Sequence, residues 1–173
     1  MELLRSPTLL SVVAIVVLVG LSAFFSSSET AIFTLSEEWV TELANSGDSD
    51  GEALRDLLDD PHRLLVTILV GNNVVNVAIA SLTTVLVTNY LPDGTGVTVA
   101  TLAASFVILI FGEIVPKSYG LSRAKEWSEV VARPIAIVET LLYPLVALFD
   151  FVTRRIAAYI GGEQDIEVPY TED

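Results

Sequence analysis

The chain has 173 residues, of which 52% are hydrophobic and 18% are charged, and its mean hydropathy is +0.62. Soluble domains average about 25% charged residues, so these values exclude an ordinary soluble protein and indicate an all-α membrane protein. The absence of cysteine excludes disulfides and thiolate chemistry, and the net charge of −13 excludes nucleic acid as a partner, because its phosphates are bound by Lys and Arg.

Three stretches are long and apolar enough to cross a bilayer, which takes about 20 residues. We expect spanning helices at about 7–34, 62–91 and 96–121. The first apolar run is too long for a signal peptide and has no cleavage site after it, so we interpret it as a retained span. The second and third spans are joined by a short turn rich in Pro and Gly, so they form a helical hairpin.

The segment between the first two spans, residues 35–60, is acidic and contains two short amphipathic patterns around a Gly/Asp/Ser turn. This arrangement predicts two short juxtamembrane helices. Their apolar faces are carried by Trp39, Leu43, Leu54, Leu57 and Leu58.

A fourth apolar stretch, at about 134–153, is ambiguous because Glu139 and Pro144 lie inside it. Lys and Arg favour the cytoplasmic side of a membrane. The positions of Lys and Arg predict that the N-terminus lies outside and the C-terminus lies in the cytoplasm. We expect a multi-pass protein of the plasma membrane. A half-membrane helix–turn–helix on the cytoplasmic side, broken near Pro144, keeps Arg154 and Arg155 inside. We therefore prefer three spans plus this hairpin over the alternative of four full spans.

Polar side chains inside a spanning helix are costly, and they are candidates for function. The polar residues and helix breakers of interest are Ser22, Ser26 and Glu29 in the first span, Asn72, Asn73 and Asn76 in the second, and Gly112, Glu113, Pro116 and Lys117 in the third. Two serines and two asparagines are spaced by four residues, so each pair shares a helix face. There are alternatives to a binding site. The serines can bond to their own helix backbone or allow close helix packing, and the asparagines can form hydrogen bonds between helices.

Near the end of the third span, Glu113 lies three residues before Pro116. A proline inside a helix removes one hydrogen bond and frees the carbonyl four residues earlier, here that of Gly112. The alternative is an ordinary proline kink with Glu113 paired to Lys117, four residues on.

Hydroxyls, amide oxygens, a freed carbonyl and one carboxylate are hard oxygen ligands. They suit Mg²⁺, Ca²⁺ or Na⁺ rather than zinc or copper, which favour His or Cys. No base stands at a recognisable spacing from the serines, and no Asp lies within the three spans. We therefore do not expect an enzyme.

Three motifs, SAFFSSSETAIFTLS, LLVTILVGNNVVN and FGEIVPKSYG, occur in this order along the chain. Together they resemble the transmembrane domain of the cyclin M (CNNM) and CorC magnesium transporters, and the resemblance covers nearly the whole chain. Ser27 is a departure, since relatives commonly have Gly there. The resemblance implies that residues 1–160 form the membrane domain. It also implies that residues 161–173 are a linker towards a cytoplasmic CBS-pair domain that is absent here.

The resemblance further implies a homodimer in the lipid bilayer that exports Mg²⁺ in exchange for Na⁺ and holds a largely dehydrated ion between the spans. The implied metal ligands are the hydroxyls of Ser22 and Ser26, the side chains of Asn72 and Asn76, the Gly112 carbonyl and Glu113. We ourselves expect structural or gating roles for Pro116, Lys117, Asn73 and Glu29. One alternative is a non-transporting domain that senses Mg²⁺ or anchors the CBS module. Another is an antiporter for Na⁺ or Ca²⁺ that uses the same oxygen ligands.

Overall fold

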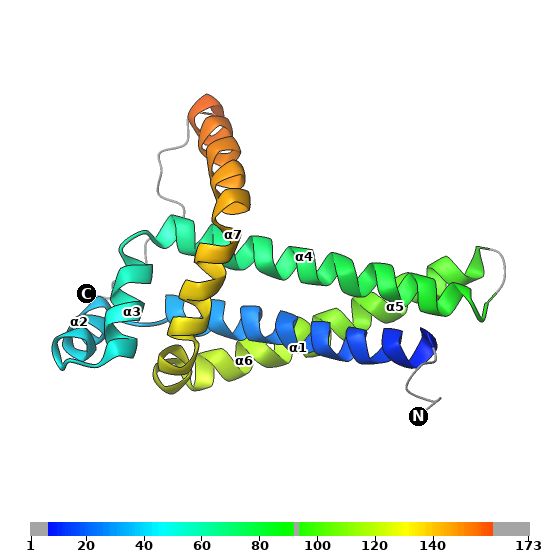
Figure 1. Cartoon of the computed structure of the whole chain (residues 1–173), viewed down its shortest axis with the longest axis horizontal. Coiled ribbons are helices and arrows are strands. Elements are labelled where there is room, and N and C mark those ends of the chain that lie inside the picture. The colour runs from blue at the N-terminus through cyan, green and yellow to red at the C-terminus, as the bar shows by residue number, and fades with distance from the viewer. Residues whose placement is uncertain (1–6, 92–93, 161–173) are drawn as a thin grey trace.

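The computed structural model describes residues 7–91 and 94–160, and these residues form helices with no β-strand among them. The elements are α1 (Pro7–Phe33), α2 (Glu37–Asn45), α3 (Ser49–Leu58), α4 (Pro61–Thr88), α5 (Thr95–Val107), the π-helix η2 (Ile108–Ile114), α6 (Val115–Ser122) and α7 (Ala124–Ile160). In Figure 1, α1, α4 and the continuous run of α5, η2 and α6 lie side by side along the long axis. The linker expected at 161–173 lies outside the described residues.

The three long helical runs coincide with the three expected spans to within a few residues. Pro7–Phe33, Pro61–Thr88 and Thr95–Ser122 are each long and apolar enough to cross a bilayer, and α7 meets the same criterion over Ala124–Ile156. The chain is therefore a multi-pass membrane protein with four candidate spanning helices among its described residues.

The two predicted juxtamembrane helices are present as α2 and α3. Ser36 caps α2 by accepting from the Trp39 amide, and Asp48 caps α3 in the same way. Between the helices the chain turns at Gly47, whose φ of 81° favours glycine. All five predicted apolar residues face the core: Leu54 and Leu57 are buried, and Trp39, Leu43 and Leu58 pack against them.

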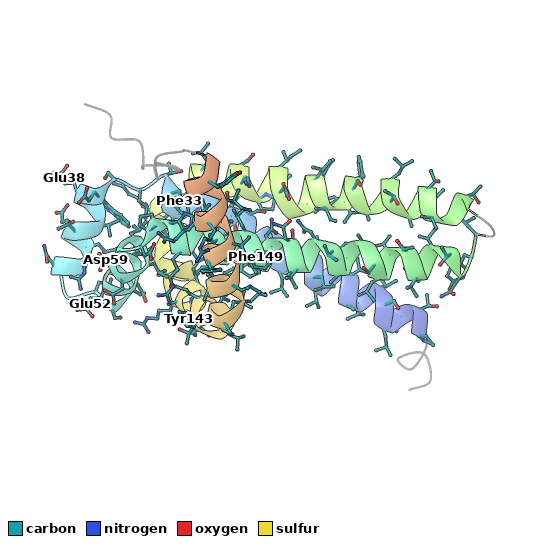
Figure 2. All side chains as sticks on the ribbon, turned by 90° about the horizontal axis from the view of Figure 1, so that it is seen from above. Phe33, Glu38, Glu52, Asp59, Tyr143 and Phe149 are labelled. Carbon is teal, nitrogen blue, oxygen red and sulfur yellow. The ribbon has the colours of Figure 1, made fainter. Side chains whose placement is uncertain are left out.

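The expected turn near Pro144 is absent. Instead, α7 is one helix that includes both Pro134 and Pro144. A proline removes one backbone hydrogen bond, which weakens a helix without necessarily ending it. Beyond Pro144 the helix is held against α4 by apolar packing, in which Val146 contacts Val66 and Val70. The helix bends along its length, and in both views it runs across α1 and α4 near one end of the bundle (Figures 1 and 2).

Two ion pairs attach α7 to its neighbours. Glu139, the acid that made this stretch ambiguous, lies 2.5 Å from Arg63 in the first turn of α4. Arg133 lies 2.6 Å from Asp50 of α3. A charged partner for Glu139 explains how an acid fits within an apolar sequence.

The core lies mostly at one end of the bundle, although Gly96 and Ala100 of α5 are buried near the other end. Every buried residue of α1 lies at Ser22 or later, and every buried residue of α4 lies at Ile79 or earlier. We call the end that carries α2, α3 and α7 the packed end, and the end at the turn between α4 and α5 the far end. At the far end the helices expose apolar side chains such as Val16 and Leu102, as expected for lipid contact.

Candidate cation site

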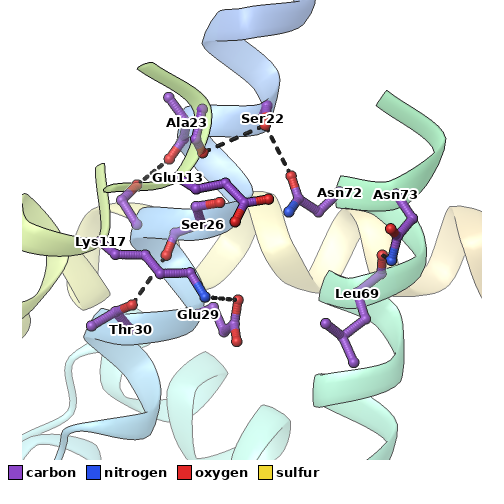
Figure 3. A network of polar contacts seen from close by, with 12 residues as sticks. Ser22, Ala23, Ser26, Glu29, Thr30, Leu69, Asn72, Asn73, Glu113 and Lys117 are labelled. Carbon is purple, nitrogen blue, oxygen red and sulfur yellow. Dashed lines mark hydrogen bonds and ion pairs between the residues drawn. The ribbon is translucent and has the colours of Figure 1, made fainter. Parts of the chain in front are cut away.

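A polar cluster lies between α1, α4 and η2, centred on the fully buried Ser22. The Ser22 hydroxyl is 2.7 Å from Oδ1 of Asn76, 3.1 Å from Oδ1 of Asn72 and 3.5 Å from the carbonyl oxygen of Gly112. In turn, the Asn76 amide nitrogen donates to Oε1 of Glu113 at 3.3 Å. We call these five residues, Ser22, Asn72, Asn76, Gly112 and Glu113, the Ser22 cluster; Figure 3 shows Ser22, Asn72 and Glu113 facing one another.

Acceptors outnumber protons around the Ser22 hydroxyl. A serine hydroxyl carries one hydrogen, so it can donate to only one of the three neighbouring oxygens at a time. Buried oxygens normally need a partner, and leaving one without a partner is unfavourable. A cation can satisfy several oxygens at once, so the arrangement favours a positive ion.

The π-helix η2 positions the Gly112 carbonyl. The N–H of Val115 bonds to the carbonyl of Ile110, five residues back, and Pro116 follows without an N–H. The predicted disturbance at Pro116 thus takes the form of a wide turn, and π-helical segments of this kind are often found at functional sites. Gly112 also has no room for a side chain, since a Cβ there would lie 2.6 Å from the Ser22 hydroxyl.

Ser26, one turn further along α1, is also fully buried. Its hydroxyl has no hydrogen-bond partner among the described residues. In the view of Figure 3 the Glu113 carboxylate points towards α4, the helix that carries Asn72. An unpaired buried hydroxyl costs about 1–3 kcal/mol, so Ser26 is a second polar group that a bound ion would satisfy.

The alternative pairing of Glu113 with Lys117 is contradicted by the structure. The Lys117 ammonium lies 3.2 Å from the carboxylate of Glu29 and so joins α6 to α1 (Figure 3). The spacing of four residues identifies possible partners on the same helix only. It does not show that Glu29 of another helix lies closer to Lys117. Glu29 and Lys117 are thus brought together, one turn away from the cluster.

Of the other residues singled out in the sequence, Asn73 lies outside the cluster. Its amide donates to the carbonyl of Leu69 on its own helix, and its side chain is exposed. Ser27 has a structural contact that the sequence did not reveal. The indole N–H of Trp127 donates to the Ser27 hydroxyl at 2.9 Å. Gly120 lies directly against the Ser27 backbone, with no space for a Cβ.

The chemistry of the site is that of neutral oxygens with a single acid. Within the part of the chain that the structure describes, no group of three or more His, Cys, Asp or Glu side chains could hold a metal ion. An ion at the Ser22 cluster would therefore be held by hydroxyl, amide and carbonyl oxygens together with one carboxylate, a set suited to hard cations.

Comparison with known proteins places this fold in a family. The sequence model described as "Cyclin M transmembrane N-terminal domain" matches residues 13–173. A chloroplastic DUF21 domain-containing protein of Arabidopsis thaliana is 39% identical over 157 residues, which cover 91% of this chain and 24% of that protein. The UPF0053 inner membrane protein YfjD of Escherichia coli is 35% identical over 152 residues, which cover 86% of this chain and 34% of that protein.

A UPF0053 protein of Haemophilus influenzae is 32% identical over 155 residues, which cover 90% of this chain and 37% of that protein. The chain therefore spans between about a quarter and somewhat over a third of the length of these relatives. The match to the family model runs through all three spanning runs and includes every residue of the Ser22 cluster. The chain belongs to the cyclin M (CNNM) transmembrane N-terminal domain family.

Proposed function

We propose that this chain is the membrane domain of a transporter whose substrate is Mg²⁺, bound largely dehydrated at the Ser22 cluster. One observation carries the proposal: the buried Ser22 hydroxyl lies within 3.5 Å of three oxygens from α4 and η2. With the unpartnered hydroxyl next to it, the proposed ligands are Ser22, Ser26, Asn72, Asn76, Gly112 and Glu113.

Spacing within the cluster is compatible with either Mg²⁺ or Ca²⁺. Mg²⁺ binds oxygens at about 2.0–2.1 Å in an octahedron, so adjacent ligand oxygens are about 2.9 Å apart, whereas the longer bonds of Ca²⁺ require roughly 3.3–3.7 Å. The Ser22 hydroxyl lies 2.7 Å and 3.1 Å from the side-chain oxygens of Asn76 and Asn72, and 3.5 Å from the Gly112 carbonyl oxygen. The first two are also ordinary hydrogen-bond lengths and the third falls in the Ca²⁺ range, so a titration with both ions decides between them.

The charge of the site supports transport rather than permanent binding. Glu113 is the only acid in the cluster, so a bound divalent ion leaves an excess positive charge and can be released. One Na⁺ would balance that carboxylate after Mg²⁺ leaves. We therefore propose export of Mg²⁺ coupled to Na⁺, with Na⁺ as the ion that replaces it.

We further propose three spans, with α7 lying in the membrane at the packed end instead of crossing it. This is supported by the direction of α7, which runs across α1 and α4 (Figure 1). The packed end also carries the basic residues Arg55, Arg63, Lys117, Arg123, Lys125 and Arg133. In this proposal the packed end is cytoplasmic and the N-terminus is outside.

The remaining features of the proposal concern the whole protein. The chain would act as a homodimer in the plasma membrane, with a cytoplasmic CBS-pair domain following it. These features rest on the family to which the chain belongs.

The first test is thermal unfolding of the purified chain in detergent, titrated with Mg²⁺, Ca²⁺, Mn²⁺ and Na⁺. An ion that binds the folded state raises its stability by RT ln(1 + [L]/Kd). We expect Mg²⁺ to raise the Tm of the wild type, and Glu113→Gln to lose this shift. Glu126→Gln is a matched control, because Glu126 is exposed and paired with Arg123 away from the cluster; it should retain the shift.

Flux of Mg²⁺ into liposomes containing the protein then separates transport from the other functions. A Mg²⁺-dependent Tm shift without flux would replace the proposal with an Mg²⁺ sensor or anchoring domain. A shift with Ca²⁺ or Na⁺ but not Mg²⁺ would indicate an antiporter for those ions. No shift with any ion would remove the Ser22 cluster as a binding site.

A further inference from the structure

We infer that the ion pair between Glu29 and Lys117 is a gate on the path to the Ser22 cluster. In this reading the Lys117 ammonium occupies the place of a cation at Glu29, and an incoming divalent ion must displace it. The inference rests on the proposed function, since it assigns a role in controlling access to that same site.

The pair lies directly between the cluster and the packed end. Glu29 is three residues beyond Ser26 on α1, and Lys117 is four residues beyond Glu113 on the third helical run. Glu29 is thus about 4.5 Å and Lys117 about 6 Å closer to the packed end, roughly one helical turn away from its neighbour in the site. Figure 3 shows the two side chains meeting one turn away from Ser26 and Glu113, with Thr30 nearby.

On the opposite side of the cluster the packing is apolar. Ile79 is fully buried there, and Leu18 and Ile108 pack against the same core. In the conformation described, a cation that passed these side chains would lose its hydration and gain no ligand, so export requires a second conformation in which this side opens. The polar route to the cluster therefore leads to the packed end, and the Glu29–Lys117 pair is the first charged group along it.

The pair has the properties of a gate that discriminates by charge. The Lys117 side chain is 41% exposed and that of Glu29 is 22% exposed, and the lysine ammonium sits on a flexible four-carbon chain that can swing aside. A divalent ion brings twice the charge of the ammonium and also coordinates oxygen, so it competes for Glu29 better than a monovalent ion does. Displacement of Lys117 thus favours divalent ions at the entrance.

A purely structural role is the rival explanation, because the pair also links α1 to α6. That link is already made without it: Gly120 packs directly on the Ser27 backbone, and Trp127 donates to the Ser27 hydroxyl at 2.9 Å. The helix contact therefore does not depend on the ion pair, and the two roles give different results when the charges are removed.

The experiment compares Lys117→Gln, Glu29→Gln and the double variant with the wild type, using Mg²⁺ and Na⁺ flux in liposomes and the Mg²⁺-dependent Tm. Lys117→Gln should raise Mg²⁺ flux at low Mg²⁺ several-fold and increase Na⁺ leak, with an unchanged Tm shift at saturating Mg²⁺. In Glu29→Gln the released ammonium can turn to Glu113, so the Mg²⁺ needed for half of the shift should rise about tenfold. The double variant should reverse that rise.

The control is Arg133→Gln, which breaks the Arg133–Asp50 pair between α7 and α3, also at the packed end. If the Glu29–Lys117 pair only links two helices, all variants will lower the Tm without Mg²⁺, as Arg133→Gln does, and leave both the Mg²⁺ requirement and the Na⁺ leak unchanged. That result overturns the gate. Failure of the proposed function is distinct, since the wild type itself would then show neither shift nor flux.

A second variant keeps the test decisive if Lys117→Gln does not fold. Lys117→Arg retains the charge, and a guanidinium can hold a carboxylate with two parallel hydrogen bonds. We expect this gate to open less readily, with slower Mg²⁺ flux and an unchanged Tm shift at saturating Mg²⁺. Wild-type flux in Lys117→Arg would contradict the inference.

Discussion

The two ends of the same helices are built on different principles. In the first half of α1, residues such as Val16 and Val17 are 65% and 57% exposed, whereas Ser22 and Ser26 in the second half are fully buried. An apolar sequence thus contacts lipid, while a polar sequence is enclosed by protein. The Ser22 cluster lies at the level where the packed region begins, so the site uses protein packing to keep its polar groups away from lipid.

The glycines differ in how much space surrounds them. A Cβ on Gly71 would lie 2.6 Å from the Phe25 ring, and one on Gly112 would lie 2.6 Å from the Ser22 hydroxyl. Gly96, at the far-end turn, is also in tight contact, because a Cβ there would lie 2.9 Å from the Leu91 carbonyl oxygen. Gly20, two residues before Ser22 on α1, has no atom within 4 Å of the same position. Small residues allow close helix approach in membranes, and Gly20 is a glycine where a methyl group can be added without a clash.

The largest effect on ion binding should come from Gly112→Ala, compared with Gly20→Ala. The added methyl group at Gly112 forces Ser22 out of position. Overpacking of this kind costs about 1–3 kcal/mol, and a cost of that size to the ion-bound state corresponds to a roughly 5- to 150-fold loss of Mg²⁺ affinity. The Mg²⁺-dependent Tm shift measures it.

Gly20→Ala introduces the same methyl group where space is free, and its helix propensity is higher. It should leave the Mg²⁺ requirement unchanged and raise the Tm slightly. Equal effects of the two substitutions would contradict the assignment of the binding site to the Ser22 cluster.

A second pair of variants compares stability at the two ends. Leu54 of α3 is fully buried, so Leu54→Ala should destabilise the fold by about 2–5 kcal/mol. Leu10 of α1 is 59% exposed at the far end, and Leu10→Ala should change stability by less than about 0.5 kcal/mol. Thermal unfolding in detergent without added ions measures both, and a large loss in Leu10→Ala would show that the far end also has a core of its own.

The smallest effect concerns the acidic surface of α2. Glu38 and Glu42 are exposed and lie one turn apart, so they can attract cations to the packed end without binding them. The double variant Glu38→Gln/Glu42→Gln should slow Mg²⁺ flux a few-fold at low ionic strength. The difference should vanish near 0.15 M salt, where the screening length is about 8 Å. A difference that persists at high salt would indicate direct binding instead of attraction.

Most of the fold could be predicted from the sequence, because the apolar runs and their length are local properties. The bounds of α1 and α4, and the pair α2 and α3, follow from such patterns. The continuity of α7 could not be predicted, since Pro144 normally interrupts a helix and only tertiary contacts such as Val146 against α4 show that it does not. The partner of Glu139 was hidden for the same reason, because Arg63 lies on another helix.

For the candidate site, spacing by four residues correctly placed Ser22 with Ser26 on one helix face, and the proline signal pointed to Gly112. Spacing could not show which helices meet. The hydrogen bond from Asn76 to Glu113 and the pairing of Lys117 with Glu29 both cross between helices. The outward direction of Asn73 likewise depends on how α4 is rotated in the bundle.

The wide turn of η2 also sets the rotational phase of everything that follows it. Each residue of an α-helix advances the chain by about 100° around the axis, so a segment with bonds to the fifth residue back shifts the phase of α6 relative to α5. Lys117 reaches Glu29 on this shifted face, while Ala104 is buried on the unshifted face before it. The helical run of α5, η2 and α6 presents one face to α1 and another to α4. Which residues lie on these faces therefore depends on the length of η2 as well as on its sequence.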